Sequence, residues 1–523
     1  MIDGTGPVDN ALRSYDVFDT VLTRLVGLPT SVFLLVGHSL VARGYWPTTC
    51  EDFLAARISA ESRARAHAGT REVTLADIYR EIRQAHELSD EIIAKLMDEE
   101  LSFEERLLRP VPTMLARLKD EHAAGLRHAF ISDMYLPARR IREWLEKFGV
   151  CRVEDGLWVS SESGATKANG DLFEAVAQVA LPSPGSWTHV GDNHWADHSV
   201  PTKRGIKAEL FTTCHLTDLE LTMERFRSES GALSSLLAGA SRWTRLTFAG
   251  DDKSRSALND YAAQIAGPVL YAFLLWILRR AQRLGVRRIW FMAEHGQVML
   301  PMMETIARRL QVDCHVGCLL ADQSPGLLGE EHCFIVDLGW NGSNAQSLDE
   351  LIGRERSSRH SYLYFGLYSR PPSCAGLDMA GYLFDIDQGR SSGVGQDIAE
   401  LPLLMRVFTQ ADHANRAWDV PLFRERMRAF ADSVAIEFCF RPDADLRDLA
   451  CSLLQKGITA PSIEQARLIA HAYSWRDVWG AFRHGEWPRL GPDCWVAGAR
   501  VLTPTVTRFL IRCAAKLGRL SSI

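Results

Sequence analysis

Four groups of chemically active side chains occur in the N-terminal part of the chain. Each group contains carboxylate, hydroxyl or amine side chains and lies at or just beyond the end of a short apolar segment that is typical of a buried strand. The groups are Asp16 with Phe18, Asp19 and Thr20; Ser132 with Asp133; Lys167; and Asp192 with Asn193 and Asp197. Because parallel strands end at the same edge of a sheet, we expect these groups to form one site.

These residue types define a chemistry. The carboxylate of Asp16, placed at a strand end, can attack phosphorus or carbon and form a covalent aspartyl intermediate. The Ser132 hydroxyl and the Lys167 ammonium can hold the oxygens of a transferring phosphoryl group. The carboxylates of Asp192 and Asp197 can bind Mg²⁺, which prefers oxygen ligands and neutralises charge between two anions. The set therefore predicts a nucleophilic aspartate beside a Mg²⁺ site.

The elements that must position this site alternate between strands and helices. Residues 14–24 are typical of a short buried strand that runs into a turn, and residues 28–125 are almost wholly helical in pattern. Beyond them we expect strands at 127–131, 156–160, 187–190 and 208–211, with helices at 139–148 and 171–179. This alternation predicts a parallel, doubly wound sheet with its site at the carboxyl ends of the strands. The helical insertion would cap that edge.

A second alternating region follows a polar stretch at 215–260. We expect a helix at 261–284, strands at 288–293, 315–320, 333–337 and 362–366, and helices near 297–310 and 344–353. Beyond about residue 400 the pattern is helical again. The predicted domains are an α/β core at 1–27 and 126–225, a helical cap at 28–125, a second α/β domain at 226–400, and a helical C-terminal region at 401–523.

The composition is that of a soluble globular protein. Of 523 residues, 46% are apolar and 24% charged, and the net charge of −6 gives no electrostatic case for nucleic-acid binding. The most apolar run, at 265–278, is shorter than the roughly 20 residues that cross a bilayer. The eleven cysteines contain no CxxC pair, which favours buried free thiols over a zinc cluster at Cys314, Cys318 and Cys333. We therefore expect a cytoplasmic protein without a transmembrane segment.

The four groups together resemble the sequence motifs of the haloacid dehalogenase (HAD) superfamily. The segment from Asp16 to Leu22 resembles motif I, Ser132 motif II, Lys167 motif III, and Gly191 with Asp192 and Asp197 motif IV. The resemblance covers about residues 14–212, and the insertion at 28–125 lies where that superfamily places its type-1 helical cap. It implies a Rossmann-like parallel sheet.

The resemblance also implies roles for individual residues. Asp16 would be the nucleophile, and Ser132 and Lys167 would contact the phosphate. Asp192 would bind Mg²⁺ together with Asp16 and the Phe18 carbonyl, and Asp197 would support the metal site. We expect the substrate to be bound by residues of the same loops and of a loop in the second half, namely Thr20, Asp133, Asn193, Gly342 and Ser343.

Phe18 departs from the phosphatase pattern. Phosphatases of the superfamily carry a second Asp at this position, and a general acid–base group of this kind contributes ~10²–10⁴-fold to the rate. Dehalogenase members also lack this Asp, but they work without Mg²⁺ and have no need of the Asp192 and Asp197 pair. Asp19 could act as the acid instead, although an extended chain would point its side chain away from the face of Phe18.

The second half contains one further candidate loop. Asp337, Gly342 and Ser343 lie between an apolar strand and a helix, where glycine and the helix N-terminus suit an anion. The loop resembles the diphosphate loop of phosphoribosyltransferases, and a simple strand–turn–helix corner would have the same pattern. The two halves together resemble large bacterial HAD-type proteins associated with surface-polysaccharide biosynthesis, some of them joined to glycosyltransferases. In those relatives Arg-Asp-Gly follows the strand ending at residue 293, where this chain has Glu-His-Gly.

The leading hypothesis is a Mg²⁺-dependent hydrolase or phosphotransferase acting on a phosphorylated small molecule, such as a sugar phosphate or a nucleotide sugar. One alternative is a dehalogenase-like hydrolase that needs no metal. The other is a non-catalytic scaffold or regulator of a glycan or natural-product biosynthetic enzyme. The partners expected are the substrate, a glycosyltransferase or other biosynthetic enzyme, and a second copy of the chain.

Overall fold

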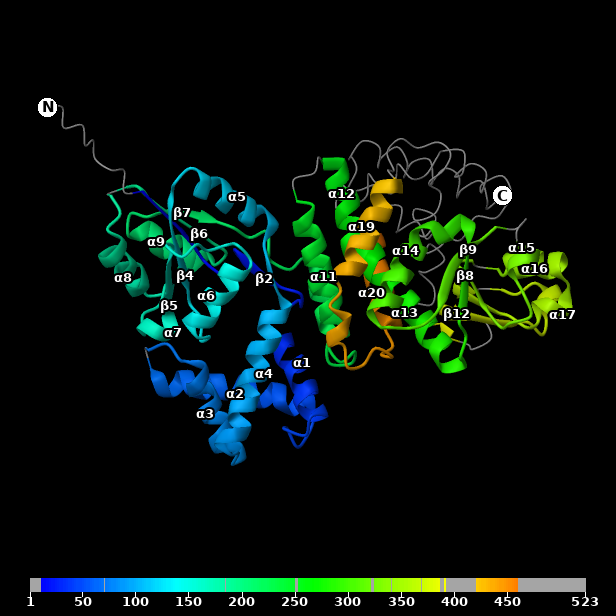
Figure 1. Cartoon of the computed structure of the whole chain (residues 1–523), viewed down its shortest axis with the longest axis horizontal. Coiled ribbons are helices and arrows are strands. Elements are labelled where there is room, and N and C mark those ends of the chain that lie inside the picture. The colour runs from blue at the N-terminus through cyan, green and yellow to red at the C-terminus, as the bar shows by residue number, and fades with distance from the viewer. Residues whose placement is uncertain are drawn as a thin grey trace, which may run out of the picture. The chain divides into compact units, whose positions relative to one another are not determined.

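The chain divides into two compact units. A computed structural model describes residues 11–69, 71–183, 185–249, 253–320, 324–339, 341–367, 369–385, 390–391 and 420–459 (Figure 1). The first unit comprises Met1–Thr217, Arg227–Arg242 and Phe438–Phe440. The second comprises Asp218–Phe226, Trp243–Glu437 and Arg441–Ile523.

The first unit is built on a five-stranded parallel sheet with the order β5-β4-β1-β6-β7. The strands are β1 (Leu12–Tyr15), β4 (Arg127–Ser132), β5 (Gly156–Val159), β6 (Trp187–Gly191) and β7 (Lys207–Leu210). Helices connect them, as parallel strands require: α5 (Pro112–Ala123), α6 (Ala138–Lys147), α7 (Ser160–Ser163), α8 (Asp171–Ala180), the π-helix η1 (His194–Ser199) and α9 (Val200–Lys203). The α/β fold class with a parallel sheet, predicted from the sequence, is confirmed.

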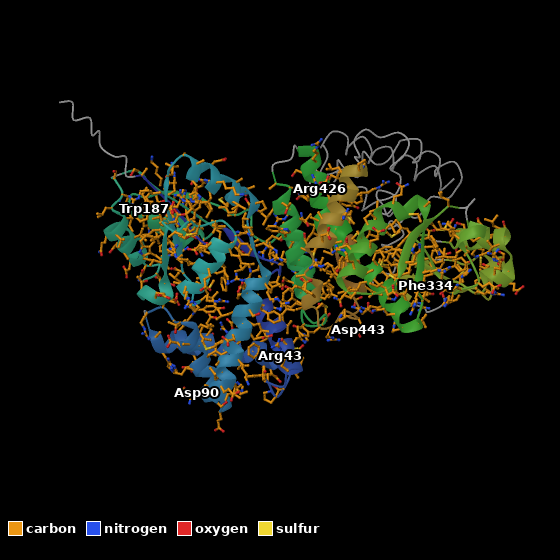
Figure 2. The ribbon with its side chains drawn as sticks, viewed as in Figure 1. Arg43, Asp90, Trp187, Phe334, Arg426 and Asp443 are labelled. Atoms are coloured by element: carbon orange, nitrogen blue, oxygen red, sulfur yellow. The ribbon has the colours of Figure 1, made fainter. Side chains whose placement is uncertain are left out.

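Alternate side chains of these strands face two different helical layers. On one face, Leu12, Ile131 and Trp187 form a buried cluster that includes Phe173 of α8; Trp187 is labelled in Figure 2. On the other face, the Tyr15 hydroxyl donates a hydrogen bond of 2.6 Å to Glu121 of α5. The sheet is therefore covered on both sides, and its carboxyl edge is left to the connecting loops.

A helical insertion separates β1 from β4. It begins and ends with two short antiparallel strands, β2 (Leu22–Arg24) and β3 (Leu108–Pro110). Between them lie α1 (Thr30–Ala42), α2 (Cys50–Ala68), α3 (Leu75–His86) and α4 (Asp90–Leu107). Thr49 and Thr74 each cap a helix in a capping box with the Asp three residues later. Inside the insertion, Arg57 of α2 and Glu100 of α4 form a fully buried ion pair at 2.8 Å.

The second unit contains a six-stranded sheet with the order β13-β12-β11-β10-β8-β9, in which β13 alone is antiparallel. Its strands are β8 (Arg288–Met292), β9 (His315–Leu319), β10 (Phe334–Asp337), β11 (Ser361–Leu367), β12 (Asp378–Asp385) and β13 (Arg390–Ser391). The principal helices are α12 (Lys253–Tyr261), α13 (Gly267–Leu284), α14 (Ala293–Arg309) and α16 (Ser343–Ile352), together with α19 (Val420–Ser433) and α20 (Arg447–Thr459).

The strand β12 has no counterpart in the sequence prediction. Its residues include Gly381, which weakens the pattern of a strand because glycine has no side chain to pack. In the structure a Cβ at Gly381 would lie 1.7 Å from the carbonyl oxygen of Phe384, and the pairing of β12 with β11 shifts register in this region. Glycine is required here by a local irregularity of the sheet.

One helical run in the described part of the chain, Arg255–Leu284, is long and apolar enough to cross a membrane by length and composition. Of its most apolar window, 94% is buried inside the protein, which is the environment of a core helix. The helical pattern expected over 401–523 is described at α19, at the short 3₁₀ turn Ile436–Phe438 and at α20. Residues 434–435 and 439–446 are described and are not helical, and residues 401–419 and 460–523 lie outside the described residues.

Candidate active site

The carboxyl edge of the first sheet brings the predicted residues together. Asp16 directly follows β1, and its backbone N–H donates to the Val190 carbonyl of β6 at 2.8 Å. Ser132 is the buried last residue of β4, the neighbour of β1. Lys167 approaches from the loop before α8, and its Nζ donates to Asp16 Oδ1 at 2.5 Å and to Asp197 Oδ1 at 2.6 Å. One buried ammonium therefore bridges two buried carboxylates.

The charges in this site do not balance. Burial raises the pKa of Asp16 to about 8; the Lys167 ammonium opposes this rise, and the carboxylates of Asp197 and Asp192 add to it. Burial works against the charged form of Lys167, but Asp16 and Asp197 outweigh it and raise the pKa of the ammonium. The pKa of Asp197 is lowered because Lys167 and His189 outweigh the effect of burial. Three carboxylates thus face one ammonium.

A divalent cation fits this arrangement. Asp16, Asp192 and Asp197 each offer a carboxylate oxygen, and these oxygens all lie within 4.8 Å of one another. Oxygen donors of this kind are the ligands that Mg²⁺ prefers. Asp192 is the most open of the three, and its Oδ2 lies 3.0 Å from His215 Nε2. The donor set can therefore hold Mg²⁺.

The turn after Asp16 differs from the sequence expectation. Asp19 has a φ of 56°, a left-handed conformation, so the chain is not extended at this point and the argument from strand alternation does not apply. Its Oδ1 accepts a hydrogen bond from Thr23 at 3.0 Å and lies 3.4 Å from Arg242 Nη1. Thr20 donates to Asp16 Oδ2 at 3.1 Å, so this buried hydroxyl orients the carboxylate of Asp16.

Phe18 lies two residues after Asp16, at the position where the HAD resemblance implies the second aspartate of a phosphatase. Its side chain is buried, and the guanidinium carbon of Arg24 lies 4.6 Å from the centre of the phenyl ring, within the range of a cation–π contact. This contact fixes the ring without supplying a proton donor.

Two residues predicted to bind substrate, Asp133 and Asn193, make structural contacts with the backbone. The carboxylate of Asp133 accepts hydrogen bonds from the backbone N–H of Lys167 at 2.8 and 3.0 Å, which holds the Lys167 loop against β4. Asn193 Oδ1 accepts from the backbone N–H groups of Trp195 and Ala196 at 2.9 Å each and so caps the π-helix η1. Substrate binding by Thr20, Asp133 and Asn193 stays a prediction.

Of the five predicted substrate residues, Gly342 and Ser343 belong to the second unit. Gly342 has a φ of 69°, and Ser343 begins α16, so the strand–turn–helix corner after β10 is present. At this corner Asn344 donates a hydrogen bond to the carboxylate of Asp337. Anion binding by this loop also stays a prediction.

A buried polar chain behind Asp197 was missed at the sequence level. His189 of β6 lies with Nε2 3.2 Å from Asp197 Oδ1 and with Nδ1 2.8 Å from the Ser14 hydroxyl. The indole of Trp187 donates to the same hydroxyl at 2.8 Å. Ser14 and His189 are register partners in neighbouring strands, which is why they meet. The sequence did contain a signal for this contact, because polar residues stand in two strands that are otherwise apolar and predicted to be buried.

Gly191 is required by the close approach of Asp197. A Cβ at Gly191 would lie 2.4 Å from Asp197 Cγ, so any other residue would push this carboxylate away. Arg242 of α11 (Leu233–Thr247) is a second missed residue, since it donates to the backbone carbonyls of Arg24 and Val26 at 2.9 and 2.8 Å and pairs with Asp19. Its distance along the sequence left no local signal.

Solved structures that resemble this chain include HAD-type enzymes. A 2-haloacid dehalogenase from Pseudomonas syringae pv. Tomato DC3000 is 16% identical, with a TM-score of 0.31 over 39% of this chain and 86% of that chain. A HAD-family enzyme from Bacteroides thetaiotaomicron is 14% identical, with a TM-score of 0.27 over 38% of this chain and 92% of that chain. No protein-family model and no curated protein matches the sequence. Similarities at this level assign neither a family nor an activity.

Proposed function

We propose that the first unit is a HAD-type, Mg²⁺-dependent hydrolase or phosphotransferase that acts through an aspartyl intermediate on a phosphorylated small molecule. The observation that carries this proposal is the Lys167 ammonium, which bridges Asp16 and Asp197 beside a third carboxylate, that of Asp192. An anionic substrate can approach an anionic nucleophile only where positive charge offsets both. Lys167 supplies part of that charge from within the chain.

Mg²⁺ would supply the remaining positive charge that the substrate and Asp16 require. Asp16, Asp192 and the Phe18 carbonyl would hold the ion, and it would offset the charge on the phosphoryl oxygens. Asp197 is bonded to Lys167, to His189 and to the backbone N–H of Asn193, which suits a supporting role.

The chain's own residues would act in two steps. A carboxylate oxygen of Asp16 attacks phosphorus, a new P–O bond forms, and the bond to the leaving group breaks with its electron pair. The Ser132 hydroxyl and the Lys167 ammonium hold the phosphoryl oxygens during this transfer. Water then attacks the aspartyl phosphate, the Asp16 carboxylate is restored, and the proton of the water passes to the phosphate product. An acceptor alcohol in place of water would give a phosphotransferase.

The site favours a leaving group that departs without a proton. Phe18 cannot donate one, and the carboxylate of Asp19 is engaged by Thr23 and Arg242. A phosphate or nucleotide leaves a phosphoanhydride as a stable anion, whereas a sugar alkoxide must be protonated. We therefore propose a phosphoanhydride, such as a nucleotide sugar, as the substrate class in preference to a sugar monophosphate.

A non-catalytic scaffold is the second candidate, and the packing of Phe18 against Arg24 is the observation that favours it. An activity assay distinguishes the enzyme from the scaffold. Purified protein is assayed with a nucleotide sugar and with a sugar phosphate, each with and without Mg²⁺. We expect Mg²⁺-dependent turnover that Asp16→Asn abolishes. Mg²⁺ binding without turnover would favour the scaffold, and metal-independent halide release from a haloacid would favour a dehalogenase. A glycosyltransferase partner, self-association and a cytoplasmic location stay predictions.

A further inference from the structure

A second cluster of metal-binding residue types lies at the opposite edge of the first sheet. It consists of His122 near the end of α5, His128 at the start of β4 and Asp155 directly before β5. Figure 1 shows these three elements in the same unit. Because His128 lies at the start of β4 and Ser132 at its end, the cluster is at the amino edge of the sheet, away from the edge that holds Asp16. It has no part in the proposed reaction.

The three side chains converge on one point. His122 Nε2 lies 3.1 Å from Asp155 Oδ2, and His128 Nδ1 lies 3.8 Å from Asp155 Oδ1. One donor atom from each residue lies within 4.8 Å of the other two, and the imidazole rings meet edge to face with centroids 4.3 Å apart. Tetrahedral ligands with bonds of 2.0–2.1 Å are roughly 3.3 Å apart. Small side-chain shifts would therefore give the spacing of a tetrahedral site.

The hydrogen bonds of His128 leave one ring nitrogen for a ligand. Its Nε2 lies 3.0 Å from Glu121 Oε2, and Glu121 is held as a carboxylate by Arg117 and by the Tyr15 hydroxyl. Since a carboxylate accepts, Nε2 carries a proton, and Nδ1 is the ring nitrogen left for a ligand. A histidine whose outer N–H donates to a carboxylate is the usual arrangement of a metal ligand.

The Nδ1 atom of His128 is otherwise unexplained. The side chain is fully buried, and within the described residues this nitrogen has no hydrogen-bond partner, although nearly all buried polar atoms have one. It faces Asp155, whose oxygens are also approached by the backbone N–H and the guanidinium of Arg152, at 2.8 and 3.4 Å. These contacts leave lone pairs on both oxygens of Asp155 for a further ligand.

We infer that His122, His128 and Asp155 bind a divalent transition-metal ion, with Zn²⁺ as the favoured ion. Two imidazoles and one carboxylate suit Zn²⁺ better than Mg²⁺, which takes oxygen ligands. The fourth ligand is water on the side of His122, whose side chain is 12% exposed while the other two are almost fully buried. The ion ties the end of α5 to the starts of β4 and β5, and three protein ligands leave its fourth position open.

The test uses untagged full-length protein treated with a chelator and titrated with Co²⁺ in excess Mg²⁺, which occupies the Asp16 edge. We expect one bound Co²⁺ with the visible absorption of a tetrahedral site, displaced by Zn²⁺. His122→Gln and Asp155→Asn should each weaken binding by at least about tenfold, and Glu121→Gln by about 10–100-fold because it removes the outer partner of His128. Circular dichroism shows that each variant is folded.

Two matched controls locate the ion. His67→Gln changes an exposed histidine that pairs with Glu81 and belongs to no three-residue cluster of metal-binding side chains within the described part of the chain. Asp192→Asn changes the carboxylate site at the other edge of the sheet. Both should bind Co²⁺ like the unmodified chain. The inference is overturned if the unmodified protein binds no Co²⁺ or Zn²⁺, if the signal survives in folded His122→Gln and Asp155→Asn, or if Asp192→Asn abolishes it.

Discussion

Lys167 Nζ lies 2.5 Å from Asp16 Oδ1, and both side chains are more than nine-tenths buried. The same ammonium contacts Asp197 at 2.6 Å, so a single cation holds two carboxylates that would otherwise repel each other. The Lys167 ammonium therefore serves both stability and activity. It stabilises the fold by pairing with Asp16 and Asp197, and it would also bind the phosphoryl oxygens of the substrate. Changes at Lys167 should therefore be visible in folding and in turnover alike.

Lys167→Gln should reduce both the stability of the fold and the rate of turnover. Removing one partner of a buried ion pair costs about 3–5 kcal/mol, because the remaining charges lose their compensation. Removing one preorganised donor lowers the rate by ~10²–10³-fold. Thermal unfolding and steady-state assays measure the two effects, and added Mg²⁺ should recover part of the lost stability. Lys147→Gln, at an exposed ion pair with Glu105, is the control and should leave both quantities unchanged. Unchanged stability in Lys167→Gln would show that the bridge is unimportant.

Substrates should be ranked by their leaving groups. Without a proton donor at Phe18, turnover of an alkyl phosphate monoester should be at least ~10²-fold slower than turnover of a phosphoanhydride. Asp19→Asn should change either rate by less than about tenfold, since Asp19 is not the acid in this scheme. Assays of both substrate classes with both proteins measure the ratio. A selective loss of monoester turnover by ~10²-fold or more in Asp19→Asn would make Asp19 the missing acid.

Gly191→Ala should displace Asp197. The new Cβ would stand 2.4 Å from Asp197 Cγ, so the bonds of this carboxylate to Lys167 and His189 must lengthen. We expect a loss of stability of about 1–3 kcal/mol from overpacking and weaker Mg²⁺ binding. Gly326→Ala, where a Cβ would meet nothing within 4 Å, is the control. Isothermal titration with Mg²⁺ and thermal unfolding test this, and unaltered Mg²⁺ affinity would contradict the placement of Asp197.

The stability of the second unit should depend on pH through Asp260 of α12. Burial raises the pKa of Asp260 to about 6, with Arg245 opposing the rise and Glu220 adding to it. The folded state therefore binds this proton more tightly than the unfolded state, and the resulting stabilisation, complete below pH 4, is lost as the pH rises through 6. Asp260→Asn should be more stable than the unmodified chain above pH 6, by up to about 3 kcal/mol.

Unfolding temperatures at pH 5 and pH 8 measure this difference. Asp443→Asn, a change at an exposed carboxylate labelled in Figure 2, should leave the pH dependence as it is. Equal stability of Asp260→Asn and the unmodified protein at pH 8 would show that burial of the charged Asp260 carboxylate does not destabilise the fold.

The placement of Asp16 and Ser132 at one edge of the sheet could be anticipated because each lies at the end of a segment with a clear strand pattern. Alternation along the chain fixes a parallel sheet, and a parallel sheet gathers its carboxyl ends at one edge. The strands β1, β4, β5 and β6 were placed to within a few residues for the same reason. The strand pattern in the sequence was therefore sufficient to place the site residues that lie at strand ends.

Contacts that depend on tertiary structure could not be anticipated. Arg242 reaches the Asp19 turn from a helix that is remote in sequence, and no periodicity relates the two. The left-handed φ of Asp19 overrides the simple alternation of an extended chain. The pairing of His189 with Ser14 requires the register of β1 and β6, which a single sequence does not specify. Asp133 and Asn193 gave a polar signal, and the folded chain uses both to fix backbone N–H groups.

The most direct measurement is the mass of the protein after it reacts with a nucleotide sugar in the presence of Mg²⁺ and is quenched in acid. One sugar-phosphoryl or nucleotidyl group should be found on the peptide that contains Asp16, and none on the same peptide of Asp16→Asn. Its amount should fall when Mg²⁺ is removed by a chelator. Turnover that proceeds without any group on Asp16, or that survives in Asp16→Asn, would contradict the assignment of Asp16 as the nucleophile.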